Sequence, residues 1–448
     1  MAKALKVGVL GVGYVGLATA GCLATKLRCV AVDRDKDRIS VLEAGRVPMH
    51  EKGLRTLLSK GRASKRLSFA VDTSALAGAD AVFIAVGTPG LEDGSIDLSQ
   101  VKSAATDLAA YLKDAKNRPL VLVRSTVVPG TTSEVVRPIL EHGSGKLSGD
   151  GFLLCSNPEF LREGSAIRDS LSPERIVLGA GDEDSLRAAR TLYRALYGPN
   201  TPPIVATTLE GAELVKYASN SLLATKVSFV NLLAGVCEQY PGTDINDVAL
   251  GIGLDSRIGR QFLQAGPGFG GSCFPKDVKA FSAYLRRLAM DSSILDGVLA
   301  INDFQPEHVV AMAEAKGGPL KGKTAAVLGL AFKADTGDVR GSRSIRLVET
   351  LLRRGATVCV HDPVAADAAK AELGARVTYC SSADDCLRGA DFAFTMTAWK
   401  EYKAIEPKRY AKLMRSPVLI DARRIYDPAV YSEHLTYVAV GRGEGRAH

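Results

Sequence analysis

The stretch KVGVLGVGYVG at residues 6–16 decides the fold, because a short apolar strand runs directly into a glycine loop that opens a helix. Glycine at 11, 13 and 16 permits a tight turn and close approach of the backbone, so a pyrophosphate can meet the positive end of the helix. The pattern is typical of a dinucleotide-binding unit. The cofactor contacts predicted in this loop are Gly11, Gly13, Tyr14, Val15 and Gly16.

Asp33 sits at the end of the next apolar run, at the place where a carboxylate grips the ribose 2′-hydroxyl of the cofactor. A carboxylate there repels a 2′-phosphate, so the sequence predicts NAD rather than NADP. A second loop at the carboxyl edge of the sheet, formed by Gly87, Thr88 and Pro89, follows another apolar strand.

Working outward, the first half of the chain alternates apolar strands with amphipathic helices, as in a doubly wound parallel sheet. The predicted strands of this half are 6–10, 29–33, 81–86, 120–124 and 152–156. The alternation restarts late in the chain, with strands predicted at 323–330, 357–361, 391–395 and 418–421. No fixed-period repeat is visible between the two halves.

A long helix is predicted between these two regions. Thr207 and Glu210 have the spacing of a capping box, and a periodic run without proline continues to about Tyr240. The expected architecture is α/β, with two Rossmann-like doubly wound domains joined by this central helix. We expect an NAD-binding domain at 1–200, a central helical and dimerisation domain at 201–315, and a second Rossmann-like domain at 316–448.

Composition excludes several classes of protein. The chain of 448 residues carries a net charge of +8 with no long Lys/Arg run and few aromatics, so no nucleic-acid partner is expected. Eight cysteines without CxxC pairs predict neither a metal site nor disulfides. The glycine-rich N-terminal stretch is a poor membrane helix, so we expect a cytoplasmic protein without a membrane partner. Only 7 Asn and 5 Gln are present, which suggests a thermophilic source.

The loop GPGFGGSCFPKD at residues 266–277 is the most informative segment for chemistry. Its glycines let backbone N–H groups approach a ligand, and Pro275 is well placed to open a helix with Cys273 at its N-terminus. A helix N-terminus and the adjacent Lys276 favour a thiolate, whereas Asp277 opposes it and can orient a proton. For the other cysteines we expect buried thiols that act as small apolar groups.

Lys216 and Asn220 stand one turn apart on the predicted long helix, on an otherwise apolar face. Two alternatives remain open for them. They are either donors to a developing oxyanion or partners in internal polar contacts.

Together these segments resemble the UDP-glucose/GDP-mannose dehydrogenase family over nearly the whole chain. The matching stretches are GVGYVG (11–16), GTP with DGSIDLS (87–99), RSTVVPGTT (124–132), SNPEFLREG (156–164), AELVKYASNSLLATKVSF (212–229), GFGGSCFPKD (268–277) and FKADTGDVR (332–340).

The resemblance implies a four-electron oxidation of a nucleotide sugar at C6, with two NAD molecules used in turn. The first hydride transfer gives an aldehyde, and Cys273 then attacks it to form a thiohemiacetal. A second hydride transfer gives a thioester, which water hydrolyses to a uronic acid. A homodimer is expected, with Arg257 reaching the partner subunit's substrate.

The resemblance also assigns residues to roles. The implied catalytic residues are Cys273, Lys216, Asn220, Asp277, Glu159 and Thr126. Beyond the two glycine loops and Asp33, the implied cofactor contacts are Arg38, Ser125, Glu163, Lys276 and Arg340. Besides Lys216 and Asn220, the implied substrate contacts are Phe160, Leu161, Arg162, Arg257, Phe262, Phe269, Gly270, Phe332, Lys333 and Arg423.

The cysteine loop carries GGSC where the branch acting on N-acetylated sugars has GGHC, which points away from that branch. Phe274 and the segment GIGLDSRIG at 251–259 resemble the UDP-glucose branch, so UDP-glucose and UDP-glucuronate are the expected substrate and product. The stretch 145–155 resembles GDP-mannose relatives, which makes GDP-mannose or another UDP-hexose the alternative. A two-electron dehydrogenase and a non-catalytic nucleotide-sugar or NAD sensor are the remaining alternatives. One departure is Leu232, where the family usually has Glu.

Overall fold

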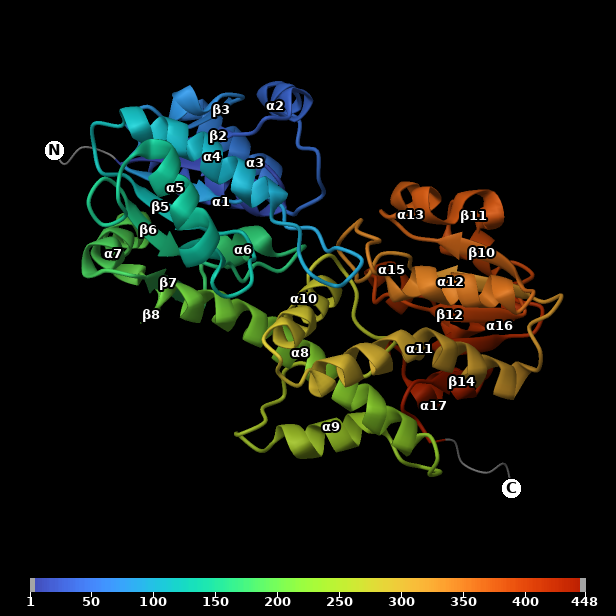
Figure 1. Cartoon of the computed structure of the whole chain (residues 1–448). Helices are drawn as coiled ribbons and strands as arrows, with labels where there is room; N and C mark the ends of the chain where they lie inside the picture. The colour runs from blue at the N-terminus through green and yellow to red at the C-terminus, as the bar shows by residue number, and fades with distance from the viewer. Residues whose placement is uncertain (1–4, 444–448) are drawn as a thin grey trace. The chain divides into compact units, whose positions relative to one another are not determined.

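The computed structural model describes residues 5–443 (Figure 1). The chain divides into two compact units, residues 1–219 and 220–448, and each is described by itself. The division falls inside the long helix α8 (Leu209–Cys237). The predicted α/β class is confirmed, because each unit is built on its own, mostly parallel sheet.

The first unit holds an eight-stranded sheet in the order β3-β2-β1-β4-β5-β6-β7-β8. Its strands are β1 (Lys6–Leu10), β2 (Arg28–Val32), β3 (Leu67–Ala70), β4 (Ala81–Ile84), β5 (Leu120–Val123), β6 (Leu153–Ser156), β7 (Ile176–Ala180) and β8 (Ile204–Thr207). The five predicted strands are present. Strands β3 and β8 were not predicted, and β3 alternates in burial while β8 is largely exposed. Strand β7 was not predicted either, although it is a largely buried apolar run.

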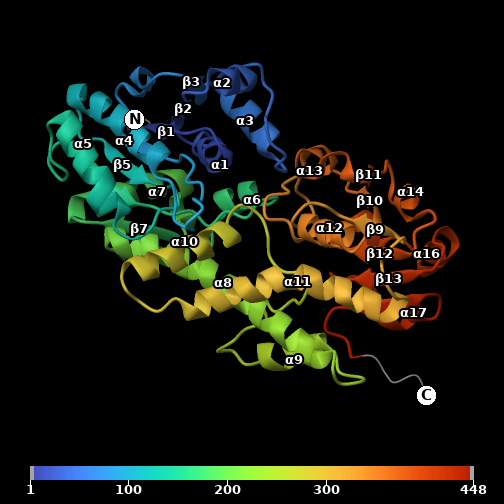
Figure 2. The same cartoon turned by 45° about the vertical axis from the view of Figure 1, so that its right-hand side comes forward.

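Helices cover both faces of this first sheet. They are α1 (Tyr14–Leu23), α2 (Lys36–Glu43), α3 (Leu54–Ala63), α4 (Ser99–Asp114), α5 (Arg137–Ser144), α6 (Ala166–Leu171) and α7 (Glu183–Tyr197). Helices α4 and α5 pack together on one face, and α1 packs against α3 and α6 on the other (Figure 2). Apolar side chains of β1, β4 and α1 form the core, in which Val7, Val9 and Leu17 are fully buried.

One pair of strands departs from the predicted parallel arrangement, because β7 runs antiparallel to β6. An antiparallel neighbour begins at the edge where the preceding strand ends. The connection at 157–175, which carries the motif NPEFLREG, therefore stays at the carboxyl edge of the sheet. This is the edge on which the glycine loop lies, and where ligands of open α/β sheets bind.

Helix α8 is shorter at both ends than predicted. Its first turn is capped by Thr208, whose hydroxyl accepts the N–H of Gly211 at 3.0 Å, so the capping residue is Thr208 and not Thr207. Thr207 instead ends β8.

The second unit holds a six-stranded sheet in the order β11-β10-β9-β12-β13-β14, with every pair parallel. Its strands are β9 (Thr324–Leu328), β10 (Thr357–His361), β11 (Thr378–Tyr379), β12 (Phe392–Thr395), β13 (Val418–Asp421) and β14 (Thr436–Ala439). Its helices are α9 (Ile245–Gly253), α10 (Phe274–Arg287), α11 (Ser293–Gly317), α12 (Arg343–Arg353), α13 (Ala366–Leu373), α14 (Ala383–Leu387), α15 (Lys400–Lys403), α16 (Pro407–Leu413) and α17 (Pro428–Ser432). The four strands predicted here are present, whereas β11 and β14 were not predicted.

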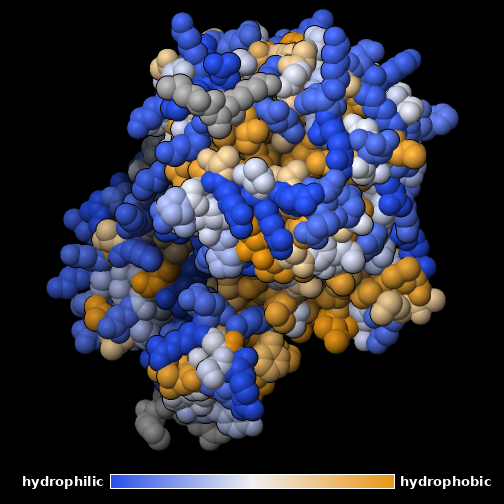
Figure 3. All heavy atoms as spheres, turned by 90° about the vertical axis from the view of Figure 1, so that its left-hand side faces the viewer, coloured by the Kyte–Doolittle hydropathy of each residue, from blue (hydrophilic) through white to orange (hydrophobic). Residues whose placement is uncertain are grey.

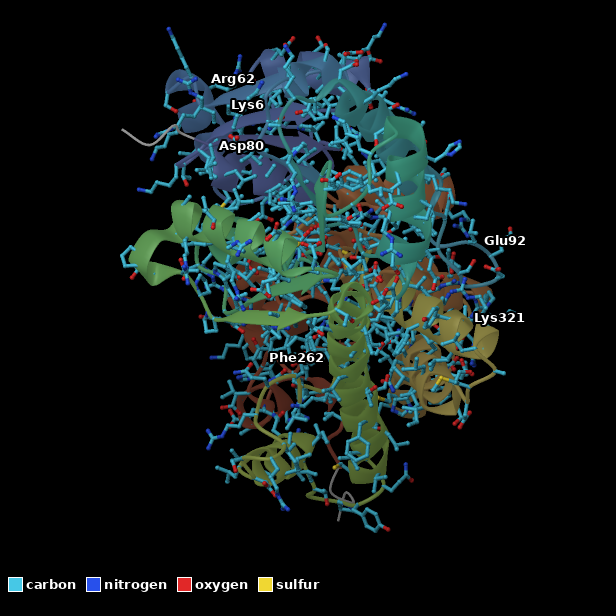
Figure 4. The ribbon with its side chains drawn as sticks, turned by 60° about the vertical axis from the view of Figure 1, so that its left-hand side comes forward. Lys6, Arg62, Asp80, Glu92, Phe262 and Lys321 are labelled. Atoms are coloured by element: carbon cyan, nitrogen blue, oxygen red, sulfur yellow. The ribbon has the colours of Figure 1, made fainter. Side chains whose placement is uncertain are left out.

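The first six strands of each sheet follow one order, which is that of the Rossmann fold. The same hydrogen bonds recur in both. The backbone N–H of Lys6 donates to the Asp80 carboxylate at 2.8 Å, and that of Thr324 donates to the Asp391 carboxylate at 2.9 Å. Lys6 and Asp80 are labelled in Figure 4. The two predicted Rossmann-like domains are confirmed, and they are structural repeats of one another.

Candidate active site

The glycine loop after β1 has the shape that a pyrophosphate requires. Gly11 has φ +94°, and a Cβ on Gly16 would lie 1.9 Å from the carbonyl oxygen of Gly11, so Gly16 allows α1 to pack against the loop. A Cβ on Gly13 would meet nothing within 4 Å, which leaves open space at the start of α1. These observations fit a dinucleotide bound by the helix N-terminus.

Asp33 follows β2 and accepts the N–H of Val12 at 2.8 Å through one oxygen and that of Asp35 at 3.0 Å through the other. Arg38 lies on α2 with a guanidinium nitrogen 3.6 Å from the same carboxylate. Asp33 therefore supports the glycine loop, and its partly exposed carboxylate is still placed to meet a ribose.

Other predicted cofactor residues gather at the same edge of the first sheet. Ser125 donates to the carbonyl of Val86 at 2.7 Å, and the Thr88 hydroxyl donates to the carbonyl of Thr126 at 2.8 Å. The loop at 87–89 is braced by α4 and its N-terminal turn, since Gly87 N–H donates to Gln100 at 3.2 Å and the Pro89 carbonyl accepts Asp97 N–H at 2.8 Å.

Glu51 is a residue that the sequence analysis missed. Its carboxylate accepts the Tyr14 hydroxyl and, at 2.7 Å, the N–H of Gly164, which follows Glu163. Burial and the nearby Glu51 raise the pKa of Tyr14. Glu51 thus links the glycine loop to the segment that carries Glu163. No local pattern in the sequence marks Glu51, because its partner Gly164 lies 113 positions away.

Glu159 and Lys216 form a buried ion pair in the first unit. The Lys216 ammonium lies 3.2 Å from Glu159, and both side chains are 5% exposed. The second oxygen of Glu159 accepts the N–H of Leu161. The guanidinium carbon of Arg175 lies over the Phe160 ring, 4.0 Å from the ring centroid. The Lys216 ammonium lies 5.4 Å from the same centroid. Arg162, a predicted substrate contact, is instead paired with Asp169 at 2.6 Å.

Glu213, one turn before Lys216 on α8, is a second missed residue. Its buried carboxylate accepts the N–H groups of Gly130 and Thr132 at 2.7 and 2.8 Å and the Thr132 hydroxyl at 2.6 Å. Burial raises its pKa to about 7. These bonds hold the start of a π-helix at Thr131–Val136, directly after the predicted Ser125 and Thr126.

Cys273 is the N-cap residue of α10, as the sequence predicted, with Pro275 in the first turn. It is the exposed cysteine among the eight, and the Ser272 hydroxyl lies 3.6 Å from its sulfur. A helix N-terminus stabilises negative charge on a side chain placed there. The position therefore suits a thiolate nucleophile.

A buried network surrounds the base of this helix. Asp277, 1% exposed, accepts the Asn220 amide and the Lys276 ammonium, each at 2.6 Å. Its backbone N–H donates to the Cys273 carbonyl at 2.8 Å. The second unit thus brings four predicted residues together: Cys273, Asn220, Lys276 and Asp277.

The two alternatives for the residue pair on α8 are therefore not exclusive. Lys216 and Asn220 each have an internal partner, and each partner is a carboxylate that the sequence had also singled out, Glu159 or Asp277. An ammonium or amide held by a buried carboxylate is preorganised for donation to an oxyanion.

The cysteine loop needs its glycines for packing within the second unit. A Cβ on Gly271 would lie 2.9 Å from the Phe332 ring, and one on Gly270 would lie 2.6 Å from the Gly341 carbonyl oxygen. Phe269 is held at both its backbone N–H and its carbonyl by Asn302, at 2.7 and 3.1 Å. Asn302, from α11, is a third residue that the sequence analysis missed.

The remaining predicted residues also lie in the second unit. Arg423 is partly buried, donates to the carbonyls of Met396 and Phe332 at 2.7 and 3.0 Å, and has its pKa lowered to about 10 by desolvation of its guanidinium. Lys333 lies 5.4 Å from the Phe332 ring centroid. Arg340 is exposed and paired with Asp338, and Arg257 is exposed and paired with Asp255. Phe262, labelled in Figure 4, has φ +63°.

A hollow of about 420 Å³ in the first unit is not this site. Leu5, Ala81, Leu120 and Leu153, which line it, lie where strands begin, at the edge opposite the glycine loop. Figure 3 views the molecule from the left-hand side of Figure 1, where apolar side chains show among charged ones. An ion pair between Arg118 and Asp184, at 2.9 Å, also lines this hollow.

Helix α8 is long and apolar enough to span a membrane by length and composition. It also carries Glu213, Lys216 and Asn220, each buried and hydrogen-bonded within its own unit. Such residues have partners in the interior of a globular protein, whereas lipid offers them none. We therefore describe α8 as the core helix of a soluble protein.

Comparison with known proteins gives matches across the chain. Models of the UDP-glucose/GDP-mannose dehydrogenase family match at residues 5–197 (NAD binding domain), 210–304 (central domain) and 326–428 (UDP binding domain). The UDP-glucose 6-dehydrogenase AglM of Haloferax volcanii is 42% identical, over 94% of this chain and 97% of that protein.

Solved structures agree with this. A UDP-glucose dehydrogenase from the hyperthermophilic archaeon Pyrobaculum islandicum is 40% identical with a TM-score of 0.90, covering 98% of each chain. A GDP-mannose dehydrogenase from Pseudomonas aeruginosa is 30% identical with a TM-score of 0.54, covering 97% of this chain and 99% of that one. The chain belongs to the UDP-glucose/GDP-mannose dehydrogenase family and is an oxidoreductase that uses NAD.

Proposed function

We propose that the chain is a UDP-glucose 6-dehydrogenase that oxidises UDP-glucose to UDP-glucuronate through a thioester on Cys273. The observation that carries this proposal is the exposed thiol at the N-cap of α10, beside the buried Asp277 network. The names of the relatives at about 40% identity support UDP-glucose rather than GDP-mannose.

NAD, when bound, accepts the hydride that leaves C6 in each of the two oxidations. The residues of the chain supply the rest of the chemistry. Glu159 or Asp277, with Thr126 holding a water, takes the proton of the C6 hydroxyl in the first step. The Cys273 sulfur then forms a bond to the aldehyde carbon, and Lys216 and Asn220 donate to the oxygen that becomes negative.

Loss of the second hydride leaves a thioester on Cys273. Water then attacks C6 and the C–S bond breaks, which releases the carboxylate and returns the thiol. The second unit is proposed to hold the nucleotide, with Lys333 and Arg423 as cations for the diphosphate. The helix N-terminus at Gly13 is proposed to hold the cofactor pyrophosphate.

The decisive experiment counts NADH. Purified protein with limiting UDP-glucose should yield two NADH for each sugar consumed. One NADH per sugar would support a two-electron dehydrogenase, and binding without turnover would support a sensor. Faster turnover of GDP-mannose than of UDP-glucose would reject the proposed substrate.

Replacement of the nucleophile tests the mechanism. Cys273→Ser should lower kcat by at least about a thousandfold, because a neutral hydroxyl is a far weaker nucleophile than a thiolate. Cys359→Ser, which changes a half-buried thiol on β10, is the matched control and should keep the native rate. Native turnover of the Cys273→Ser variant would end the thioester mechanism.

A homodimer is proposed on the basis of one exposed face of α8. Leu222, Phe229, Leu232 and Val236 are each at least half exposed, and their spacing places them along one stripe. Leu232 is the departure from the family pattern, and it extends this apolar stripe. Phe229→Glu should shift the mass in solution toward the monomer, and Arg257→Ala should lower turnover without changing that mass.

The division into domains at 1–200, 201–315 and 316–448, a cytoplasmic location and a thermophilic source remain proposals. Limited proteolysis should cleave near residues 200 and 315 if the three parts are separate. A melting temperature well above the mesophile range of about 45–65 °C is expected for a thermophilic protein.

A further inference from the structure

Three thiols lie together in the second unit, far along the chain from Cys273. Cys359 is on β10, Cys380 follows β11, and Cys386 is on α14. All three belong to the apolar cluster that α14 forms with the second sheet. From the sequence we expected inert buried cysteines at these positions, and the proposed reaction does not use them.

Strand geometry explains why they meet. Cys359 pairs with Thr378 in the parallel ladder of β10 and β11, and the N–H of Cys380 continues that ladder to the Val360 carbonyl at 2.9 Å. Side chains two residues apart on a strand share a face, so Cys380 lies on the same face as Cys359. Cys386 approaches this face from α14, with its sulfur 3.9 Å from the Val327 carbonyl.

The three thiols differ in exposure. Cys386 is fully buried, whereas Cys359 and Cys380 are partly exposed. Cys359 and Cys380 both pack against the buried cluster that contains Cys386, and the neighbouring thiols of Cys386 and Cys359 lower the pKa of Cys380 to about 7. A partly exposed thiol with a low pKa beside a second thiol is the arrangement found in oxidant-sensitive proteins.

The segment from Cys380 to Cys386 is also compact. Ser381 and Ser382 both donate to the Asp385 carboxylate, at 2.9 and 2.7 Å, and the Ser382 hydroxyl accepts the Asp385 N–H at 3.1 Å. These bonds hold the turn between the two cysteines in the reduced protein.

We propose that Cys380 and Cys386 are a peroxide-oxidised thiol pair that forms a reversible disulfide, independent of catalysis at Cys273. The Cys380 thiolate attacks hydrogen peroxide, an S–O bond forms, the O–O bond breaks, and hydroxide leaves and is protonated to water. The Cys386 sulfur then attacks that of Cys380, the S–O bond breaks, and the thiol proton leaves with the departing oxygen as a second water. Two thiols lose two electrons, and peroxide gains them.

The chain offers a direct readout. Trypsin cleaves after Arg376 and Arg388, so peptide 377–388 holds both cysteines, while Cys359 lies in peptide 355–370. The full-length protein is treated with hydrogen peroxide, its remaining thiols are alkylated, and it is digested without reductant. We expect peptide 377–388 to be unalkylated and lighter by two hydrogen atoms, and to regain both thiols after dithiothreitol.

Matched variants keep the proposal falsifiable. The modification should persist in Cys359→Ser and in Cys273→Ser, and it should vanish in Cys380→Ser and Cys386→Ser. Peptides 355–370 and 377–388 joined to each other in the native chain would show that Cys359 is the partner and overturn the assignment. Full alkylation of peptide 377–388 at peroxide doses that oxidise Cys273 would overturn the proposal altogether. The masses and the alkylation of these peptides do not depend on turnover, so a negative result would not bear on the proposed function.

Discussion

The two sheets begin alike and then diverge at the loop after their first strand. In both, the glycine after that strand donates to the end of the neighbouring strand at 2.8 Å, Gly11 to Val32 and Gly329 to His361. In both, the next N–H donates at 2.8 Å to the Asp after that neighbouring strand, Asp33 or Asp362. The first strand, the glycine after it and the Asp of the neighbouring strand therefore have the same arrangement in both sheets.

The two loops differ in how soon a helix begins after the glycine. In the first unit α1 starts at Tyr14, three residues after Gly11, whereas in the second unit α12 starts at Arg343, well beyond Gly329. The first unit thus has a helix N-terminus directly after its glycine. The second has a loop there that carries Lys333. The first arrangement is suited to bind phosphates with backbone N–H groups, and the second with cationic side chains.

The largest expected effect separates the two binding functions. Gly16→Ala puts a Cβ 1.9 Å from a backbone oxygen, and Gly329→Ala puts one 1.9 Å from the Thr397 hydroxyl at φ +100°. We expect Gly16→Ala to weaken NAD binding about a hundredfold and to leave UDP binding intact, with the reverse for Gly329→Ala. Titration calorimetry with each ligand checks this. Equal weakening of both ligands by either variant would contradict the assignment of one ligand to each unit.

A smaller effect is expected at the paired aspartates. Asp362 is 5% exposed and accepts the N–H groups of Leu330, Ala331, Val364 and Ala365, whereas Asp33 accepts two N–H groups at a more open position. Replacing each by Asn turns an amide N–H toward these donors. The local free energy of unfolding should fall by about 2–3 kcal/mol for Asp362→Asn and about 1 kcal/mol for Asp33→Asn.

Hydrogen exchange of β9 in Asp362→Asn and of β1 in Asp33→Asn measures these two values. Equal losses for the two variants would mean that the two aspartates stabilise their loops equally, and that burial does not distinguish the units.

A further effect, comparable in size to those of the aspartates, concerns pH and the first unit alone. Burial raises the pKa of Glu213 from its ordinary value of 4.5 to about 7, so its stabilising contribution is complete below about pH 4.5 and is lost as the pH rises through 7. Relative to Glu213→Gln, the wild-type first unit should lose on the order of 2 kcal/mol between pH 5 and pH 8. Hydrogen exchange of β5 measures this loss, and β12 of the second unit, which should show no difference, is the control.

Local patterns in the sequence predicted much of this molecule. Nine strands, the two Rossmann-like sheets and the N-cap position of Cys273 follow from apolar runs, glycines and Pro275, all of which act over a few residues. The unpredicted strands other than β7 are short or poorly buried, whereas β7 is a largely buried run of five residues. Strand β11 has two residues, and β8 is largely exposed, so neither leaves a clear apolar pattern.

The missed site residues have a different cause. Glu51 reaches Gly164 across 113 positions, Asn302 reaches Phe269 across 33, and Glu213 reaches Thr132 across 81. No local pattern reports a contact of that range. Glu213 did carry one clue, because it is an acid one turn from Lys216 on the same helix, and a charged group there needs a partner just as Lys216 does.

The bond from Glu213 back to Gly130 and Thr132 has a consequence for how the protein is made. During synthesis at about 5–20 residues per second, Gly130 and Thr132 emerge roughly 4–16 s before Glu213, which lies 81 residues beyond Thr132. Until Glu213 arrives, two buried N–H groups at the start of the π-helix lack their acceptor. The start of the π-helix in the NAD-binding unit is therefore fully hydrogen-bonded only after α8, the helix that leads into the second unit, has emerged from the ribosome.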